Sequence, residues 1–182
     1  MDEAGRGPLA GPVVAAAVIL APGGWVEGAR DSKVLSTAAR EELYARILEV
    51  AVSVGIGAAS PREIDRVNIL VATARAMARA LARLRPRPDH VVVDGLPMRG
   101  LAWEHEAIIG GDASVHSIAC ASIVAKVCRD RLMRRLASRY PPYGWIQNVG
   151  YGTADHREAL RLHGPTPHHR LTFTGLQLEL EL

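Results

Sequence analysis

The stretch Asp2-Glu3-Ala4-Gly5-Arg6-Gly7-Pro8-Leu9-Ala10-Gly11-Pro12 places two carboxylates before a glycine-rich turn, and the apolar run Val13–Leu20 follows it directly. The run is only eight residues long, contains β-branched residues and lies between Pro12 and a Pro-Gly-Gly turn. These features favour a fully buried strand over a helix. The sequence therefore predicts a glycine-rich loop and two acids beside the first long strand of a sheet.

Two further acids occupy comparable positions. Asp94 closes the apolar run 91–93, and Asp112 follows Gly110-Gly111 before a long helical pattern. Carboxylates that meet at strand ends and at a helix entrance repel one another, and a bound divalent cation relieves that repulsion. Hard cations such as Mg²⁺ take oxygen ligands and keep positions for water and phosphate. The pattern predicts metal-assisted phosphate chemistry, although each acid alone is equally typical of a surface charge or, for Asp112, a helix cap.

Strands and helices alternate along the rest of the chain, which indicates an α/β or α+β fold around a mixed sheet. Ser36 is a predicted helix cap, and Ser60, Pro61 and Glu63 predict a helix start with a capping box. Prolines and glycines set the other predicted boundaries. We expect further strands at 51–59, 90–94 and 104–109, and helices at 36–49, 60–84 with a break near Asn68, 114–139 and 153–163. The helix at 114–139 has a predicted inner stripe of Ile118, Ile123, Val127 and Leu132. The tail 176–182 is too short to assign.

The net charge of +3 and pI near 9.2 conceal a local excess of cations. Residues 126–139 carry Lys126, Arg129, Arg131, Arg134, Arg135 and Arg139 against one acid, Asp130. Such a segment suits a polyanion. It equally suits a solvated helix face with cations near the helix C-terminus, and the sequence leaves both readings open.

The two cysteines and the apolar runs limit the location of the protein. Cys120 and Cys128 are eight residues apart on a predicted helix, a rise of about 12 Å that is too long for a disulfide. The sequence contains no CxxC pair, so a zinc site is not expected. No apolar run approaches the roughly 20 residues of a membrane span, and the opening does not resemble a signal peptide. We therefore expect a cytoplasmic protein with reduced thiols and no membrane partner.

Ordered blocks across nearly the whole chain resemble bacterial ribonuclease HII. The opening loop is similar to the first block of that family, and Asp31-Ser32-Lys33 to the second. The remaining blocks are Glu63-Ile64-Asp65 with Asn68-Ile69-Leu70, Val92-Val93-Asp94-Gly95, Gly111-Asp112, Ser117-Ile118-Ala119, Ala121 to Lys126, Tyr140-Pro141, Gly150-Tyr151-Gly152-Thr153, His156 and His169-Arg170.

The resemblance implies a ribonuclease-H-like fold: a mixed five-stranded sheet flanked by helices, with a helical C-terminal portion. It implies one domain over 1–182, with a catalytic core at about 1–139 and an extension at about 140–182. The implied activity is endonucleolytic hydrolysis of RNA in RNA–DNA hybrids and at single ribonucleotides in duplex DNA. Two ions of Mg²⁺ or Mn²⁺ serve as cofactors, and the products carry 3′-hydroxyl and 5′-phosphate ends. We expect a monomer; the sequence names no protein partner.

By the same resemblance, the catalytic and metal-binding residues are Asp2, Glu3, Asp94 and Asp112. The backbone of Gly5, Arg6 and Gly7, with Tyr151, is implied to sense the ribose 2′-hydroxyl. Candidates for phosphate contacts, which position a duplex without reading its sequence, are Ser32, Lys33, Asn68, Ser122 and Lys126. Arg129 is instead expected to pair with a nearby carboxylate, and His156 and His169 to be structural.

Two features depart from the family pattern. Only Met1 precedes Asp2, so we expect the acidic pair to lie at a frayed terminus with loosened carboxylates. Asn148-Val149 stands where the family often has His-Lys. The missing cation predicts weaker binding to the nucleic-acid backbone and a salt slope lower by about one unit.

Two alternatives compete with a metal-dependent ribonuclease. One is a catalytically impaired nucleic-acid-binding remnant, caused by the missing leader. The other is a hydrolase of small phosphorylated substrates that shares the sheet. The four retained acids favour the nuclease, whereas the basic segment and Tyr151 argue against the small-substrate enzyme.

Overall fold

A computed structural model describes residues 1–30 and 32–173 of the chain. The described residues form five strands: β1 (Asp2–Ala4), β2 (Val13–Leu20), β3 (Ala51–Ala59), β4 (Val92–Asp94) and β5 (Glu106–Ile108). The helices are η1 (Ser32–Val34), α1 (Thr37–Val50), α2 (Pro61–Val67), α3 (Ile69–Leu81), α4 (Gly111–Ser114), α5 (His116–Ala137), η2 (Pro141–Tyr143), α6 (Trp145–Asn148) and α7 (Ala154–His163). The predicted tail 176–182 and the predicted block residue Asp31 lie outside the described residues.

The strands divide into two sheets instead of the single predicted sheet. β1, β2 and β3 form an antiparallel sheet in that order, and β4 pairs with β5 in parallel. Antiparallel and parallel pairs together give the predicted mixed character. Two backbone hydrogen bonds of Met1 connect the sheets: its nitrogen donates to the Val92 carbonyl at 2.7 Å, and its carbonyl accepts from the Asp94 N–H at 3.1 Å.

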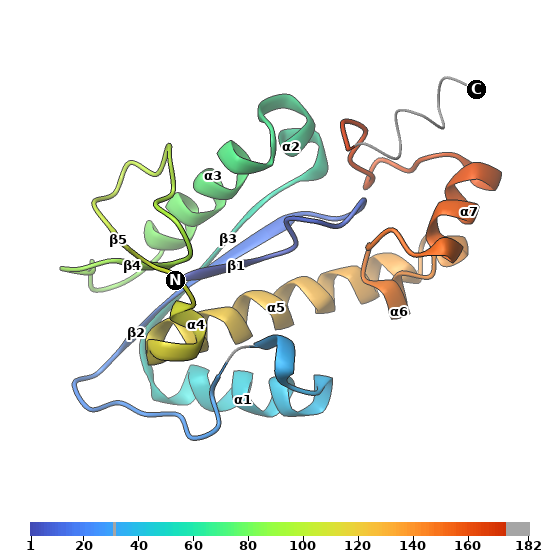
Figure 1. The fold of residues 1–182 in the computed structure, drawn as a ribbon. Helices are drawn as coiled ribbons and strands as arrows, with labels where there is room; N and C mark the ends of the chain where they lie inside the picture. Colours follow the sequence, from blue (N-terminus) through green and yellow to red (C-terminus); the bar gives the residue numbers. More distant parts are fainter. Residues whose placement is uncertain (31, 174–182) are drawn as a thin grey trace.

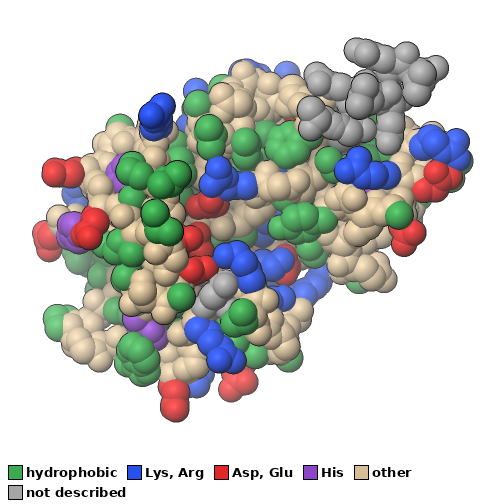
Figure 2. Space-filling view, in the orientation of Figure 1, with side chains coloured by type: hydrophobic (Ala, Val, Ile, Leu, Met, Phe, Trp, Pro, Cys, Tyr) green, Lys and Arg blue, Asp and Glu red, His purple; other side chains and the backbone are tan. Residues whose placement is uncertain are grey.

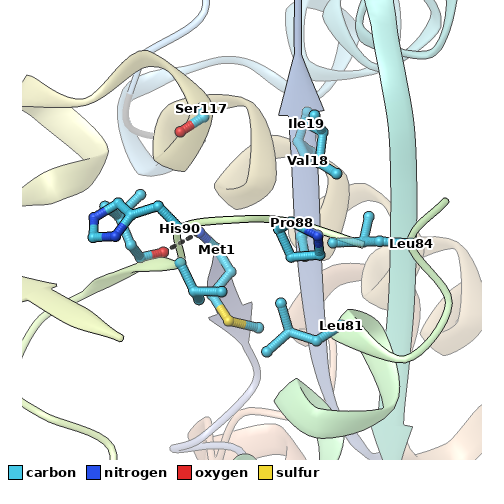
Figure 3. Close-up of a pocket in the computed structure, with 11 residues that line it drawn as sticks. Met1, Val18, Ile19, Leu81, Leu84, Pro88, His90 and Ser117 are labelled. Atoms are coloured by element: carbon cyan, nitrogen blue, oxygen red, sulfur yellow. Dashed lines mark hydrogen bonds between the residues drawn. The ribbon is translucent and has the colours of Figure 1, made fainter. Parts of the chain in front are cut away.

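The prediction of a frayed N-terminus is wrong. Met1 is only 4% exposed, because its backbone is bound by β4 and its side chain packs in the core. Figure 3 shows the side chain pointing toward Leu81, beside a small cavity of about 70 Å³. Asp2 and Glu3 therefore lie on a strand that is held on both sides, by β2 and through Met1 by β4.

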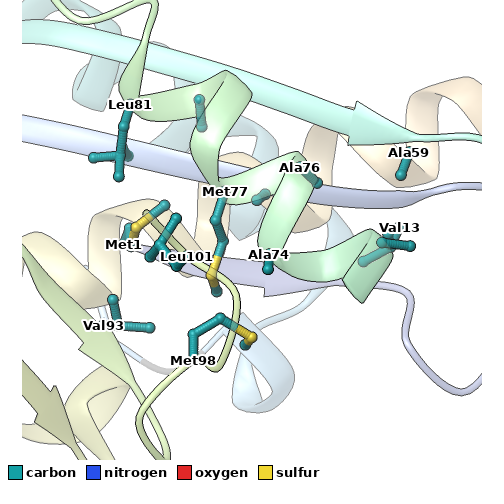
Figure 4. Packing of buried hydrophobic residues seen from close by; sticks show 14 of the residues in the cluster. Met1, Val13, Ala59, Ala74, Ala76, Met77, Leu81, Val93, Met98 and Leu101 are labelled. Carbon is teal, nitrogen blue, oxygen red and sulfur yellow. The ribbon is translucent and has the colours of Figure 1, made fainter. Parts of the chain in front are cut away.

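Helices cover both faces of the β1–β3 sheet (Figure 1). Val13, Ala15 and Ala17 of β2 pack in the core beneath α3, which Figure 4 shows together with Met1 and Val93. The alternate residues Ala16 and Val18 pack against α5 and α1 on the other face. Because successive side chains of a strand point to opposite faces, a continuous apolar run is needed for burial on both sides, as the sequence predicted.

Glycine allows α3 to lie directly on β3. A Cβ atom on Gly55 would lie 2.1 Å from the Ala80 carbonyl oxygen, and one on Gly57 2.1 Å from the Ala76 carbonyl oxygen. The alanine-rich face of α3, with Ala76 and Ala80 fully buried, completes this close contact. The two glycines inside the strand thus mark a backbone approach and not a turn.

The helix predicted at 114–139 is interrupted near its start. Val115 has extended backbone angles (φ −117°, ψ 113°), which separate the single turn α4 from α5. Ile118, Ile123 and Val127 of the predicted stripe are buried, but Leu132 is 39% exposed. Met133 is buried in its place, because this end of α5 packs on the glycine-rich loop and on α6 instead of the sheet.

The other predicted elements are present with smaller boundary changes. Ser36 and Ser60 cap α1 and α2 as expected, Thr153 caps α7, and Asn68 separates α2 from α3. The helix α3 ends at Leu81 instead of 84, and β4 and β5 are each shorter than predicted. The Glu63 carboxylate, expected to complete a capping box, accepts hydrogen bonds from Arg75 and Arg79.

We predict that Gly57→Ala destabilises the fold by about 1–3 kcal/mol, because the new methyl group must separate α3 from β3. Denaturant unfolding monitored by circular dichroism measures the change. The control is Val52→Ala, since Val52 is half exposed on the same strand and its loss is expected to cost under about 0.5 kcal/mol. Equal stability of Gly57→Ala and the parent protein would contradict the contact.

Candidate active site

Three of the four predicted metal-binding carboxylates converge. Asp2 lies on β1, Asp94 ends β4 and Asp112 lies in α4. One oxygen atom from each lies within 4.8 Å of the others. Met1 makes β1 and β4 neighbours, and the Asp112 N–H donates to the Asp94 carboxylate at 3.4 Å. The geometry is thus fixed by backbone contacts between the elements that carry the acids.

The turn before α4 brings Asp112 to Asp94. Gly110 adopts a left-handed conformation (φ 66°) and precedes the helix without a side-chain cap. A Cβ on Gly111 would lie 2.6 Å from the Ile118 side chain and 3.4 Å from Asp94, so a larger residue here would displace Ile118. Asp112 lies inside α4, and its side chain is not the N-cap. The helix-cap role that the sequence allowed as an alternative to metal binding therefore does not apply.

The cluster is electrostatically crowded. Burial, and then the charges of Glu3 and Asp94, raise the pKa of Asp2 to about 7, against the opposing hydrogen bonds from the Glu3 N–H and Ser122. Each pair of ionised carboxylates at this separation repels by about 3 kcal/mol at an effective dielectric constant of about 20. The Lys33 ammonium, 3.1 Å from the Asp112 carboxylate, offsets part of the charge.

Glu3 lies beside this group of three, not in it. Its carboxylate accepts a hydrogen bond from Arg6 at 3.2 Å. Burial raises the pKa of Glu3, and the neighbouring Arg6 opposes that shift. Glu3 nevertheless lines the same cleft as Asp2 and Asp94.

The cleft beside the acids has a volume of about 270 Å³. Figure 2 shows acidic and basic side chains close together near the middle of this face of the molecule. Most of the predicted substrate-binding residues line the cleft, and they are Gly5, Arg6, Gly7, Ser32, Lys33, Ser122, Lys126 and Tyr151. Residues that are far apart in the sequence are thus brought to one surface.

Asn68 is the predicted substrate-binding residue that does not line this cleft. Its side-chain oxygen accepts from the Leu70 and Val71 N–H groups and caps α3. Its contact with a substrate stays a prediction. Ser32 and Ser122 share a hydrogen bond of 2.7 Å at the cleft, and the Lys126 ammonium donates to Asp130 at 2.7 Å.

The basic segment of α5 is largely engaged within the protein. Arg131 and Arg134 both bond to Glu41 of α1, and Arg131 lies over the Tyr44 ring. Arg129, expected to pair with a carboxylate, instead donates to the carbonyls of Ala10, Pro12 and Val149. That expectation is wrong, because Arg129 points beneath the glycine-rich loop, where backbone carbonyls gather.

The segment that carries Tyr151 is held by buried polar groups. His156 donates from Nδ1 to the Tyr151 carbonyl, and its Nε2 accepts from the Trp145 N–H at 3.1 Å. The Asn148 side chain donates to the Tyr143 carbonyl and accepts from the Gly150 N–H. The asparagine that departs from the family pattern therefore fixes the turn before Tyr151, whose own ring is half exposed at the cleft.

Two residues that support the glycine-rich loop were not predicted from the sequence. Arg129 and Arg170 are 1% and 0% exposed, and both donate to carbonyls of the segment Gly5 to Pro12. Nothing in the residue pattern around them distinguishes a buried arginine from a surface one. Cys120 and Cys128 are free thiols, as predicted.

Comparison with known proteins identifies the family. The family model described as Ribonuclease HII matches residues 1–176. This chain belongs to the ribonuclease HII family. It is 58% identical over 176 residues to a Ribonuclease HII of Thermosynechococcus vestitus, covering 95% of this chain and 81% of that protein. It is 56% identical to one of Ruegeria pomeroyi, covering 95% and 74%.

A solved structure agrees with the fold. The ribonuclease H2 from Pyrococcus horikoshii superposes with a TM-score of 0.82 at 30% identity, covering 99% of this chain and 95% of that one. Membership of the ribonuclease HII family makes the chain a ribonuclease H, a divalent-metal-dependent endonuclease acting on RNA–DNA hybrids. Among the described helices, none has the length and apolar character to cross a membrane.

The buried histidine pair predicts how stability depends on pH. His169 accepts from the Thr166 N–H at Nδ1, so its Nε2 carries the proton and donates to His156. Burial and then the charge of His156 lower the pKa of His169 to about 4. An unfolded histidine titrates near about 6.5, so between these values the unfolded chain binds more protons. The contribution of His169 to stability is therefore complete above about pH 6.5 and decreases as the pH falls toward 4.

We expect His169→Gln to remove this contribution from the pH dependence of the free energy of unfolding, measured in denaturant between pH 7 and pH 5, whatever its effect on stability at pH 7. Asp2, with its raised pKa, contributes in the opposite direction in parent and variant alike, so the difference between the two curves isolates His169. His163→Gln is the control, because His163 is exposed at the end of α7, and it leaves the slope unchanged. Parallel curves for all three proteins would contradict the role of the pair.

Proposed function

We propose that the chain hydrolyses the RNA strand of RNA–DNA hybrids and also cuts at single ribonucleotides within duplex DNA. In this proposal Asp2, Glu3, Asp94 and Asp112 are the catalytic, metal-binding carboxylates. The observation that carries it is the convergence of Asp2, Asp94 and Asp112 within 4.8 Å beside a cleft lined by glycines, lysines and a tyrosine.

The donor set fits hard divalent cations. All three converging groups are carboxylates, and oxygen ligands suit Mg²⁺ and Mn²⁺. Asp2 and Asp94 would hold a cation between β1 and β4, with Asp112 closing the site from α4, and Glu3 would extend the set on the cleft side. Two such ions, when bound, supply an activated water and stabilise the departing 3′ oxygen, which gives 3′-hydroxyl and 5′-phosphate ends.

The remaining residues of the cleft bind and orient the substrate in this proposal. The Gly5-Arg6-Gly7 backbone contacts the ribose 2′-hydroxyl, and the half-exposed Tyr151 ring packs on the neighbouring sugar. Ser32, Ser122, Lys33 and Lys126 contact phosphates on either side of the cut. Such contacts set the register of a duplex and leave its base sequence unread.

The catalytically impaired remnant is not favoured. Its premise was a loose N-terminus, whereas Met1 is buried and Asp2 lies on a strand paired with β2. The small-substrate hydrolase is disfavoured by membership of the ribonuclease HII family.

We also propose that residues 1–182 act as one domain, a monomer in the cytoplasm. Contacts between the predicted core and extension support the single domain. Arg129 of α5 reaches the Val149 carbonyl, and Arg170 reaches the loop at Gly5.

The function is tested with duplex DNA that carries one internal ribonucleotide. We expect purified protein to cut beside the ribonucleotide with Mg²⁺ or Mn²⁺ and to leave a 5′-phosphate, and EDTA to abolish the cut. An all-DNA duplex of the same sequence stays intact, and a continuous hybrid is cut. Cutting of the hybrid alone would remove the single-ribonucleotide activity. Binding without cutting of either substrate would favour the remnant.

We predict that Asp94→Asn lowers kcat by more than about 100-fold, because groups that only support metal ligands already contribute 10–100-fold. The melting temperature stays equal or rises, since one negative charge leaves the cluster. Added Mn²⁺ stabilises the parent protein more than the variant. Asp89→Asn, which changes an exposed acid, serves as the control with parental activity. An Asp94→Asn enzyme as fast as the parent would remove Asp94 from the site.

A further inference from the structure

Two buried arginines lie beneath the glycine-rich loop. Arg170 donates to the Gly5 carbonyl at 2.5 Å, the Arg6 carbonyl at 2.8 Å and the Gly11 carbonyl at 2.9 Å. Arg129 donates to the Ala10 carbonyl at 3.0 Å and the Pro12 carbonyl at 3.1 Å. Five carbonyls of one short segment are therefore turned toward the interior by two side chains.

The orientation of these carbonyls fixes the orientation of the amides. In a trans peptide the N–H points opposite to the C=O of the same unit. Because Arg170 holds the Gly5 and Arg6 carbonyls inside, the N–H groups of Arg6 and Gly7 point away from it. Among the hydrogen bonds of residues 1–30 and 32–173, neither N–H has a protein acceptor. Both residues line the cleft, and successive N–H groups form a concave site for electron-rich oxygen.

The loop has little freedom to rotate these peptide units. Gly5 has φ +91°, and a Cβ there would lie 1.9 Å from the Arg129 Nε atom. Gly11 has φ +85°, and a Cβ there would meet the Met133 sulfur at 2.3 Å. The side chains of Arg129 and Met133 thus fill the space under the loop, and only glycine permits so close a contact.

The charges beneath the loop are costly to keep. Neither Arg129 nor Arg170 forms an ion pair within the described part of the chain. Burial lowers the pKa of both, that of Arg170 to about 9 with a further contribution from Arg129. Apolar side chains fill a core at lower cost than buried charges. Fixing the peptide units and providing positive potential under a polyanion site are benefits that apolar side chains lack.

We propose that Arg170 is a positioning residue for substrate specificity, which aims the Arg6 and Gly7 amides at the ribose and adjacent phosphate. The inference rests on the proposed function and adds to it the group that orders the loop. Asp65 extends the support, because its carboxylate accepts from the Leu171 and Thr172 N–H groups and so fixes the chain directly after Arg170.

The test compares Arg170→Lys with the parent protein. Lysine keeps the charge but lacks the fork that reaches three carbonyls. With EDTA present, we expect the parent to bind a ribonucleotide-containing duplex more tightly than the all-DNA duplex, and Arg170→Lys to lose most of that preference. We expect kcat/KM on the single-ribonucleotide substrate to fall at least about tenfold. In ¹⁵N–¹H spectra, the Arg6 and Gly7 amide signals shift on adding the ribonucleotide duplex to the parent but not to the variant.

The control is Arg83→Lys, because Arg83 also donates to a backbone carbonyl, that of Ile56 in β3. This variant keeps the parental preference. If Arg170→Lys does not fold, Gly5→Ala decides, with Gly23→Ala as its control. Gly23 has a similar φ of +75° and no atom within 4 Å of a new Cβ. Gly5→Ala loses the preference and Gly23→Ala keeps it.

A parental preference retained in folded Arg170→Lys, or in Gly5→Ala when that variant decides, would overturn the inference while leaving the proposed function intact. A parent that cuts no ribonucleotide substrate would instead refute the proposed function. Even then, if the Arg6 and Gly7 amide signals shift as much in Arg170→Lys as in the parent on adding the duplex, Arg170 does not position these amides.

Discussion

The candidate site depends on holding three like-charged carboxylates close together where the two sheets meet. Asp2, Asp94 and Asp112 repel one another, so the backbone must hold them in place. Met1 supplies part of that restraint through its two hydrogen bonds to β4, and the glycine turn before α4 supplies the rest. A site built in this way is already positioned for a cation, and cation binding relieves the repulsion that the fold tolerates.

Rigid packing behind the acids makes such strain tolerable. The strand β2 is buried on both faces, and the backbone of α3 packs directly against the glycines of β3. Small residues at this contact leave few ways for the sheet to shift. The helix α5 crosses the opposite face and also reaches the loop and the C-terminal helices (Figure 1). One helix therefore connects the acids with the segment that carries Tyr151.

Local patterns in the sequence predicted most of this framework. The apolar run of β2, the serine caps of α1 and α2 and the break at Asn68 are local signals, and the structure confirms them. The errors arise where distant contacts decide. The acidic pair was expected at a frayed terminus because only Met1 precedes it, and the sequence does not reveal that Met1 binds β4, about ninety residues away. Leu132 was expected inside because periodicity does not reveal which neighbour covers the end of a helix. The roles of the four acids came from family resemblance, and convergence of three supports them.

The buried arginines show why the supports of the glycine-rich loop were the hardest part of the site to predict. Four acids in the order of a family pattern suggest a metal before the chain is folded, although each acid alone is equally typical of a surface charge. An arginine that binds carbonyls looks like any surface cation until the chain is folded. Arg129 and Arg170 come from segments forty residues apart and meet under a loop more than one hundred residues earlier. Gly150 accepts hydrogen bonds from Leu9 and Ala10 through its carbonyl, so the loop and the Tyr151 turn share one backbone connection. In our proposal the acids determine the chemistry, and the backbone held by the arginines determines which sugar that chemistry meets.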